Sequence, residues 1–221
     1  MKKKEILKLE KVGYRYKDAK KDEYVLNDIS YKFETGTIYA IKGKSGSGKT
    51  TLLSLISGLE KNYIGNIIYN DRELKSIDLD KYRSQDIGIV FQSYNLLPHL
   101  TTFENITLSM DINHSKIKDK KTKVLELLDS VGLKHELSDR RILKLSGGEQ
   151  QRVAIARSLS YNPLMIIADE PTGNLDKETE NEIMKIFTKL AHEDGKCVII
   201  VTHSDNVSNQ CYKVYELKAK K

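Results

Sequence analysis

Residues Gly43–Thr50 carry the strongest chemical signal in the chain. The stretch reads Gly-Lys-Ser-Gly-Ser-Gly-Lys-Thr and fits G-x-x-x-x-G-K-[ST], the pattern of loops that wrap nucleotide phosphates. Its glycines can adopt positive φ and bring successive backbone N–H groups close to an anion. Lys49 adds a positive charge that can reach the β- and γ-phosphates, and the Thr50 hydroxyl can ligate Mg²⁺. The sequence therefore predicts a nucleoside triphosphate site.

Two carboxylates supply a second part of such a site. Asp169 and Glu170 follow the apolar run Leu164–Ala168, which is typical of a strand buried on both faces. A carboxylate at the strand tip can hold the Mg²⁺ shell, and its neighbour can orient or deprotonate water. We therefore expect Asp169 to be a metal ligand and Glu170 to be catalytic.

Two more polar residues directly follow runs that are typical of buried strands. Gln92 comes after Ile87–Phe91, and His203 lies just past Cys197–Val201. Gln92 can ligate a metal or orient water, although its local pattern favours an ordinary polar strand end. His203 can contact the γ-phosphate or be an ordinary loop histidine. Because parallel strands share one carboxyl edge, we expect the phosphate loop, the carboxylates and His203 to meet there.

The segment Leu145–Arg152 reads Leu-Ser-Gly-Gly-Glu-Gln-Gln-Arg. Ser146 and Glu149 predict a capping box at the start of a helix. Capping alone does not explain Gly147 and Gly148, because glycine in a first turn is entropically unfavourable. Glycines there make sense if another backbone or a phosphate comes close, so this helix start is a candidate second anion site.

Tyr16 is a candidate contact for a purine base. It precedes the polar stretch 17–23, which is expected to be a loop. An exposed ring at such a position can stack on a base, and a hydrophobic contact that fixes the path of the chain is the alternative.

The spacing of apolar residues predicts the elements that position these groups. Thr37–Ile41 is expected to be a strand, and helical spacing follows the loop as far as Gly58. Alternation over Ile6–Lys11 and Ile29–Glu34 predicts antiparallel strands. Residues 93–145 have helical periodicity. The predicted fold is therefore α/β: a P-loop core with a parallel central sheet, an N-terminal antiparallel β subdomain and an inserted α-helical subdomain.

Within the helical part, one apolar face is expected to be buried and to end near Gly132; it consists of Val124, Leu127, Leu128 and Val131. The very polar stretch Asn113–Lys123 is expected to be a turn. After the carboxylates, Asp176 is expected to cap another helix.

Composition favours a soluble protein in the cytoplasm. The 221 residues are 31% charged, the mean hydropathy is -0.49, and no apolar run is long enough to span a bilayer. The basic start of the chain has no apolar core behind it, so a signal peptide is not expected. Cys197 and Cys211 lack metal or disulfide spacing, and Cys197 is expected to be buried. The lysine-rich stretches behind the net charge of +6 can face acidic lipids or nucleic acid, but most such runs are simply solvated.

Together these residues resemble the ATP-binding subunit of ABC transporters over nearly the whole chain. Gly43–Thr50 is similar to the Walker A loop, Leu164–Asp169 to Walker B, Gln92 to the Q-loop glutamine and Leu145–Gln150 to the family signature. Asn174–Asp176 resembles the D-loop, His203 the switch histidine and Tyr16 the adenine-stacking aromatic residue. The signature is the most discriminating element, because other P-loop ATPases lack it.

The resemblance implies ATP and Mg²⁺ as cofactors. Catalysis would depend on Lys49, Glu170 and His203, and metal binding on Thr50, Gln92 and Asp169. The implied nucleotide contacts are Tyr16, Gly43, Ser45, Gly46, Ser47, Gly48, Lys49, Thr50, Thr51, Gln92, Ser146, Gly147, Gly148 and Asp176.

The resemblance also implies partners. Two copies would form a head-to-tail dimer in which each ATP lies between the Walker A loop of one copy and Gly147 and Gly148 of the other. Residues 1–92 and 146–221 would form the nucleotide-binding core, and 93–145 would contact a membrane permease on the inner face of the cell membrane. No nucleic-acid partner is expected.

Within the family, Tyr94–Leu97, Glu104–Asn105 and Glu170–Asp176 look most like the lipoprotein-release and macrolide or peptide exporter branch. This implies export of a peptide, lipoprotein or antimicrobial compound through a separate permease. An ATPase of the cell-division type, which remodels the envelope without net transport, is the alternative. A soluble ABC ATPase of DNA repair or translation fits less well. Coiled-coil chromosome proteins insert hundreds of residues before the signature, and translation factors usually carry tandem cassettes.

Overall fold

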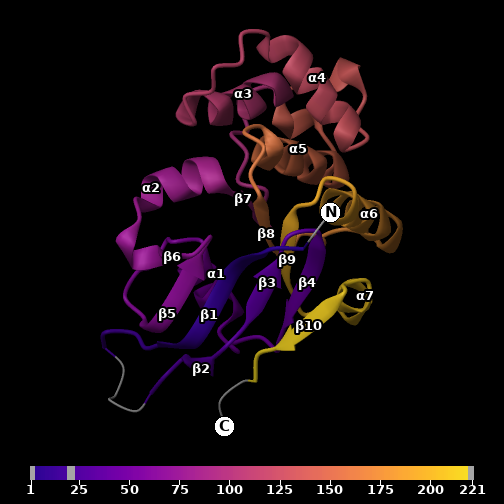
Figure 1. Cartoon of the computed structure of the whole chain (residues 1–221). Helices are drawn as coiled ribbons and strands as arrows, with labels where there is room; N and C mark the ends of the chain where they lie inside the picture. The colour runs from indigo at the N-terminus through magenta and orange to yellow at the C-terminus, as the bar shows by residue number, and fades with distance from the viewer. Residues whose placement is uncertain (1–2, 19–22, 219–221) are drawn as a thin grey trace.

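A computed structural model describes residues 3–18 and 23–218, and its centre is a parallel sheet (Figure 1). The strands run in the order β10–β4–β9–β8–β7, and every neighbouring pair is parallel. They are β4 Thr37–Lys42, β7 Ile87–Val90, β8 Met165–Asp169, β9 Cys197–Thr202 and β10 Lys213–Glu216. The predicted parallel sheet is confirmed, and the carboxyl ends of β4, β9 and β8 are neighbours.

Strand β9 explains why the strands of this sheet are apolar throughout. Val198 and Ile200 belong to one buried core, whereas Cys197, Ile199 and Val201 belong to the core on the other side of the sheet. Because both faces are covered, neither set of alternating side chains reaches water. The predicted burial of Cys197 is confirmed, and burial raises the pKa of its thiol well above the usual value.

An antiparallel sheet is built around β1 (Glu5–Tyr14). Its other strands are β2 (Leu26–Ile29), β3 (Lys32–Glu34), β5 (Ile64–Tyr69) and β6 (Arg72–Glu73). The antiparallel subdomain is thus confirmed. The prediction of one continuous strand over residues 29–34 is wrong, because the strand is interrupted at 30–31. Before the interruption β2 pairs with the C-terminal end of β1, and after it β3 pairs with the N-terminal end of β1.

Gly65 marks the place where β5 kinks against β1. Its φ is +78°, and a Cβ on this residue would lie 2.4 Å from the carbonyl oxygens of Glu10 and Lys11. The register between the two strands shifts between Glu10 and Gly13. Only glycine meets both the conformational and the steric requirement of this bulge.

We therefore expect Gly65→Ala to lower the free energy of unfolding by about 2–4 kcal/mol, the sum of a left-handed backbone and an overlap with β1. Gly36→Ala is the matched control in urea unfolding. Gly36 also has positive φ, +69°, but the nearest atom to a Cβ there is the Ala191 carbonyl oxygen at 3.9 Å. The control should lose only about 1–2 kcal/mol. Equal losses in both variants would contradict the steric part of the argument.

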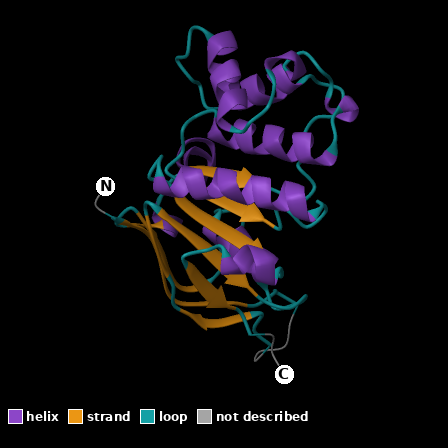
Figure 2. Cartoon of the chain, turned by 90° about the vertical axis from the view of Figure 1, so that its right-hand side faces the viewer, coloured by secondary structure: helices purple, strands orange, loops and turns teal. Residues whose placement is uncertain are grey.

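The longer helices are α1 Lys49–Ile56, α3 Thr102–Ile112, α4 Lys120–Ser130, α5 Gly147–Leu159 and α6 Lys177–His192. Shorter ones are α2 Leu79–Lys81 and α7 Asp205–Asn209, with 3₁₀ turns at Leu74–Ser76, His135–Leu137 and Ile142–Lys144 and a π turn at Tyr82–Asp86. Figure 2 shows the helices α3, α4 and α5, which we call the helical layer, gathered at the end of the molecule beyond the strands.

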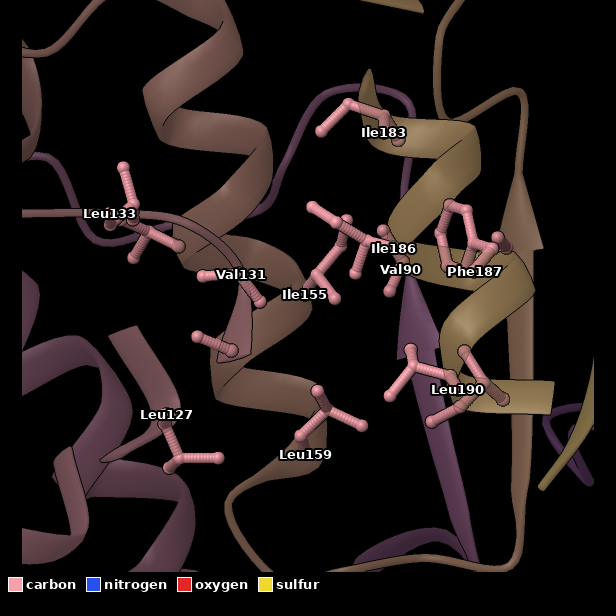
Figure 3. Packing of buried hydrophobic residues seen from close by; sticks show 14 of the residues in the cluster. Val90, Leu127, Val131, Leu133, Ile155, Leu159, Ile183, Ile186, Phe187 and Leu190 are labelled. Atoms are coloured by element: carbon pink, nitrogen blue, oxygen red, sulfur yellow. The ribbon is translucent and has the colours of Figure 1, made fainter. Parts of the chain in front are cut away.

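Apolar side chains join the helical layer to the sheet. Val90 of β7 faces Ile155 of α5 and Ile186 of α6 in this core (Figure 3). The apolar face predicted for α4 is buried, and Gly132 follows the helix with a φ of +69°. The polar turn expected at 113–123 is shorter than predicted, because α4 already begins at Lys120, where Asp119 caps it. That residues 93–145 form a subdomain of their own stays a prediction.

Among residues 3–18 and 23–218, no helix combines the length and the apolar character that crossing a membrane requires.

Candidate nucleotide site

The phosphate loop connects β4 to α1 and depends on its glycines. Gly46 and Gly48 have φ values of +78° and +91°, and a Cβ on Gly43 would lie 2.3 Å from Ser47 Oγ. Gly48 is the N-cap of α1, and no described side chain caps the helix start. The first N–H groups of α1 therefore lack a side-chain acceptor, as a site for phosphate requires.

Lys49 lies between this loop and the carboxylates. Its ammonium donates to the carbonyl oxygens of Gly43 at 2.7 Å and Lys44 at 3.2 Å. Its Nζ is also 4.0 Å from Glu170 Oε1, and both side chains are nearly buried. A positive charge is thus held at the point where β4 and β8 end.

Glu170 follows β8 and is held by the neighbouring strand. Its Oε2 accepts hydrogen bonds from Thr202 Oγ1 at 3.1 Å and from the His203 backbone N–H at 3.3 Å. Its Oε1 is 2.8 Å from His203 Nδ1. The backbone of Glu170 has a φ of +44°, which is uncommon for a residue other than glycine and is typical of functional sites. Glu170 and His203 therefore form one fixed unit.

Asp169 is the last residue of β8 and lies beside this unit. Burial raises the pKa of its carboxyl, the negative charge of Glu170 raises it further, and Lys49 acts in the opposite direction. A carboxylate in such surroundings gains from a bound cation, because the cation supplies the charge that water cannot.

Gln92 and Tyr16 lie at two ends of the site. Gln92 follows β7, and its Nε2 is 3.1 Å from the place of a Cβ on Gly173, in the turn after Glu170. The Tyr16 hydroxyl is 3.3 Å from Thr51 Oγ1 in the first turn of α1. Tyr16 is 55% exposed, and its ring lies at right angles to that of Tyr14 with the centroids 5.2 Å apart, so part of the Tyr16 side chain is open to solvent beside α1.

The predicted capping box at the start of α5 is present, formed by Ser146 and Glu149. Gly147 is exposed, and a Cβ there would lie 3.1 Å from the Tyr94 hydroxyl. A Cβ on Gly148 would lie 2.7 Å from Thr179 Cγ2 of α6. Close packing of the starts of α5 and α6 therefore explains why position 148 is glycine, and the sequence alone did not reveal this contact.

Asp176 caps α6, as predicted. Its Oδ1 accepts from the Thr179 backbone N–H at 3.0 Å, and its Oδ2 accepts from Thr179 Oγ1 at 2.7 Å. These hydrogen bonds lower the pKa of Asp176, so its carboxylate is engaged in the helix cap.

The structure brings some of the expected residues together and leaves others apart. Lys49, Asp169, Glu170 and His203 meet at the carboxyl edge of the sheet. A cleft of about 640 Å³ lies beside this group and shares only His203 with it; it is lined by Lys42, Gly43, Lys44, His203, Asp205, Glu216, Leu217 and Lys218. Within the described part of the chain, neither Ser146–Gly148 nor Asp176 has a hydrogen bond or ion pair with the phosphate loop. Ser45 and Thr50 are exposed on that loop.

Thr202 is a site residue that sequence reasoning missed. Its hydroxyl donates to Glu170 and accepts from the Ser204 backbone N–H at 3.0 Å. The only signal was its place at the end of an apolar run, and threonine is common in strands for packing reasons alone.

The residues present fit a magnesium nucleotide. The loop offers uncapped N–H groups and Lys49, and the hydroxyl of the buried Ser47 has no partner among the described residues. Thr50 and Asp169 supply oxygen ligands of the kind that Mg²⁺ prefers, and the carboxylate is partly desolvated.

Known proteins resemble the chain over nearly its full length. A family model described as ABC transporter matches residues 26–173. The ABC transporter ATP-binding protein YclH of Bacillus subtilis is 44% identical, over 92% of this chain and 89% of the relative. The lipoprotein-releasing system ATP-binding protein LolD of Idiomarina loihiensis is 39% identical, over 96% of this chain and 94% of the relative.

A solved structure agrees in fold. The dimeric post-hydrolysis state of the ATP-binding cassette MJ0796, bound to ADP and Pi, superposes with a TM-score of 0.86 at 35% identity, over 98% of this chain and 97% of that chain. MJ0796 comes from Methanocaldococcus jannaschii. The matched model spans most of the chain, and the relatives and the fold agree with it. The chain therefore belongs to the ABC transporter family, as an ATP-binding subunit that hydrolyses ATP with Mg²⁺.

Proposed function

We propose that this chain drives export through a separate membrane permease, with ATP hydrolysed at the carboxyl edge of its parallel sheet. The observation that supports hydrolysis at this edge is the fixed unit of Glu170 and His203, 4.0 Å from the ammonium of Lys49, and the similarity to lipoprotein-releasing ATP-binding proteins supports export. A general base, a polar partner and a cation at one sheet edge are what phosphoryl transfer to water requires.

Each residue has a role in this reaction. The phosphate loop from Gly43 to Thr51 binds the triphosphate, and Tyr16 stacks on the base. Thr50 and Asp169, with Gln92 from the neighbouring strand end, hold the metal. When bound, Mg²⁺ neutralises charge on the β- and γ-phosphates. Lys49 exchanges its contacts with loop carbonyls for contacts with phosphate oxygens, which are charge-assisted and stronger.

Glu170 acts on the attacking water. Its carboxylate accepts a proton as the water oxygen bonds to the γ-phosphorus, and the bond from that phosphorus to the bridging oxygen of ADP breaks. The products are ADP and inorganic phosphate. The bonds from Thr202 and His203 keep the carboxylate from turning away, so its orientation is set before the water arrives.

A second copy of the chain completes the site. Gly147 is exposed at the start of α5, where it can approach the γ-phosphate held by the partner copy, and Ser146 and Gly148 shape this helix start. Asp176 acts mainly by capping α6, whose start packs against Gly148. The dimeric state of MJ0796 supports this arrangement.

Residues 93–145 contact the permease on the inner side of the membrane. Within residues 93–145, large apolar side chains are exposed: Leu97, Leu108, Ile112 and Leu143. Such side chains favour contact with another protein. The LolD relatives belong to a lipoprotein-releasing system, which makes a lipoprotein or a similar amphipathic molecule the favoured cargo.

Affinity purification of the full chain from its own membranes in mild detergent tests this function. We expect an integral membrane permease to copurify, and a variant with Leu97, Leu108 and Ile112 replaced by serine to lose it while still binding ATP. Recovery of ribosomal or chromosomal proteins without a membrane partner would overturn the transporter proposal.

A further inference from the structure

The segment after β7 contains a strained turn. Tyr94 and Asn95 have φ values of +61° and +50°, so two successive residues other than glycine are left-handed. The only other such pair in the described part of the chain, Asn70 and Asp71, has a local explanation, because it forms the tight hairpin turn between β5 and β6. The turn at Tyr94 links no paired strands. It has local hydrogen bonds from Tyr94 N–H to the Phe91 carbonyl at 3.1 Å and from Asn95 N–H to the Ser93 carbonyl at 2.6 Å, and two left-handed residues in succession favour further contacts from outside the turn.

Arg157 of α5 supplies two such outside contacts. Its guanidinium donates one hydrogen bond to the Tyr94 carbonyl oxygen at 2.9 Å and another to the Asn95 carbonyl oxygen at 2.5 Å. No described carboxylate forms an ion pair with this guanidinium, and burial lowers its pKa. A half-buried cation is thus engaged with two backbone carbonyls that lie more than sixty positions away in sequence.

Tyr94 connects the two ends of α5. Its carbonyl is bonded at Arg157, near the end of the helix, and its hydroxyl lies beside Gly147 at the start. These two helix positions are about 15 Å apart along the axis at 1.5 Å per residue. The side chain of Arg157 can reach Tyr94 because helical side chains lean toward the N-terminus.

Gln92 is tied to the same segment. It lies two residues before Tyr94, and its side chain contacts the turn at Gly173 that follows Glu170. A short path of contacts therefore runs from the turn after Glu170 through Gln92 and Tyr94 to Gly147. Arg157 is the side chain that fixes the middle of this path to α5.

We propose that Arg157 is a positioning residue that holds Gln92 and the Gly147 end of α5 in one fixed relation, so that a change at the hydrolytic site of one copy reaches the surface that its partner uses. This inference rests on the proposed function, because it assumes that Gly147 meets a nucleotide bound to a second copy. Without Arg157 the turn relaxes, and the two sites of a dimer no longer change together.

The test compares two arginines on one helix. Arg157→Met removes both bonds to the turn. Arg152→Met is the matched control, because Arg152 donates to the Val131 carbonyl at 2.7 Å and to Glu182 at 2.5 Å and does not touch the turn. In Arg157→Met alone, we expect amide hydrogen exchange at residues 93–97 to become at least tenfold faster, kcat for ATP to fall about tenfold and KM to stay within twofold. Arg157→Lys keeps the positive charge but cannot donate to both carbonyls from one planar group. Its exchange rate at 93–97 and its kcat should lie between those of the native chain and Arg157→Met.

Unchanged exchange at 93–97 with unchanged kcat in Arg157→Met would overturn the inference. So would faster exchange over the whole chain with a raised KM, which indicates a merely structural role. If the methionine variant does not fold, the lysine variant decides by the same readouts. Failure of the native chain to dimerise with ATP would refute the proposed dimer instead. The difference in amide hydrogen exchange at 93–97 between Arg157→Met and Arg152→Met, measured without nucleotide, would still test the contact of Arg157 with the turn.

Discussion

Glu170→Gln is expected to reduce ATP turnover by about 10²–10⁴-fold, the usual contribution of a general base. The amide has nearly the shape of the carboxylate. Its oxygen can still accept from Thr202 Oγ1 and the His203 N–H, and its NH₂ group can donate to His203 Nδ1 in the tautomer that accepts there. What it loses is the capacity to take a proton from water.

Single-turnover hydrolysis and equilibrium ATP binding separate these effects. ATP affinity should stay within a fewfold of the native value, and the variant should accumulate as a dimer with Mg-ATP. Glu180→Gln is the control, because Glu180 accepts hydrogen bonds from Thr172 and Asn206 on the same side of the molecule and has no proposed chemical role. Near-normal turnover in Glu170→Gln would remove Glu170 from the mechanism.

Lys49→Met should act one step earlier, on nucleotide binding. A hydrogen bond to a charged group contributes about 1.5–3 kcal/mol, so the loss of two phosphate contacts corresponds to a decrease in affinity of about 100-fold or more. The substitution also removes the ammonium that lies 4.0 Å from Glu170 Oε1. The first consequence lowers the affinity for the triphosphate, and the second disturbs the position of Glu170, the proposed general base.

Titration calorimetry with Mg-ATP would measure this effect. Lys44→Met is the matched control, because Lys44 is in the same loop but its side chain is exposed and the loop pattern leaves that position open. We expect its affinity to change by less than about threefold, as for most exposed charges. Equal losses in the two variants would mean that the loop attracts ATP through net charge and not through Lys49.

The central part of the site could be predicted because each of its functional groups belongs to a short, continuous stretch of sequence. The phosphate loop, the carboxylate pair and His203 each follow a buried strand, and parallel strands bring their ends to one edge whatever lies between them. The register pairs Lys42 with Thr202 and Asp169 with Val201, so adjacent strand ends hold these groups close together.

Other features depend on side chains that meet only after the chain has folded. No local pattern links Gly148 to Thr179, or Arg157 to Tyr94 and Asn95. The positive φ of Glu170 is likewise imposed by its bonds to β9 and not by the preference of a glutamate. The interrupted strand at 30–31 follows from the pairing with β1, which the alternation of apolar residues alone does not encode.

The contact between Tyr94 and Gly147 has a consequence for how such proteins diversify. The segment between these residues begins and ends at nearly the same point, so its two ends are already close together. An exchange of this segment between relatives would need to match this junction and the apolar core that the segment shares with α5 and the sheet, and the cost of loop closure changes slowly with the length of the graft. Engineered chimeras that keep this junction and the shared apolar core are therefore expected to change what the helical end recognises while the sheet-edge site stays the same.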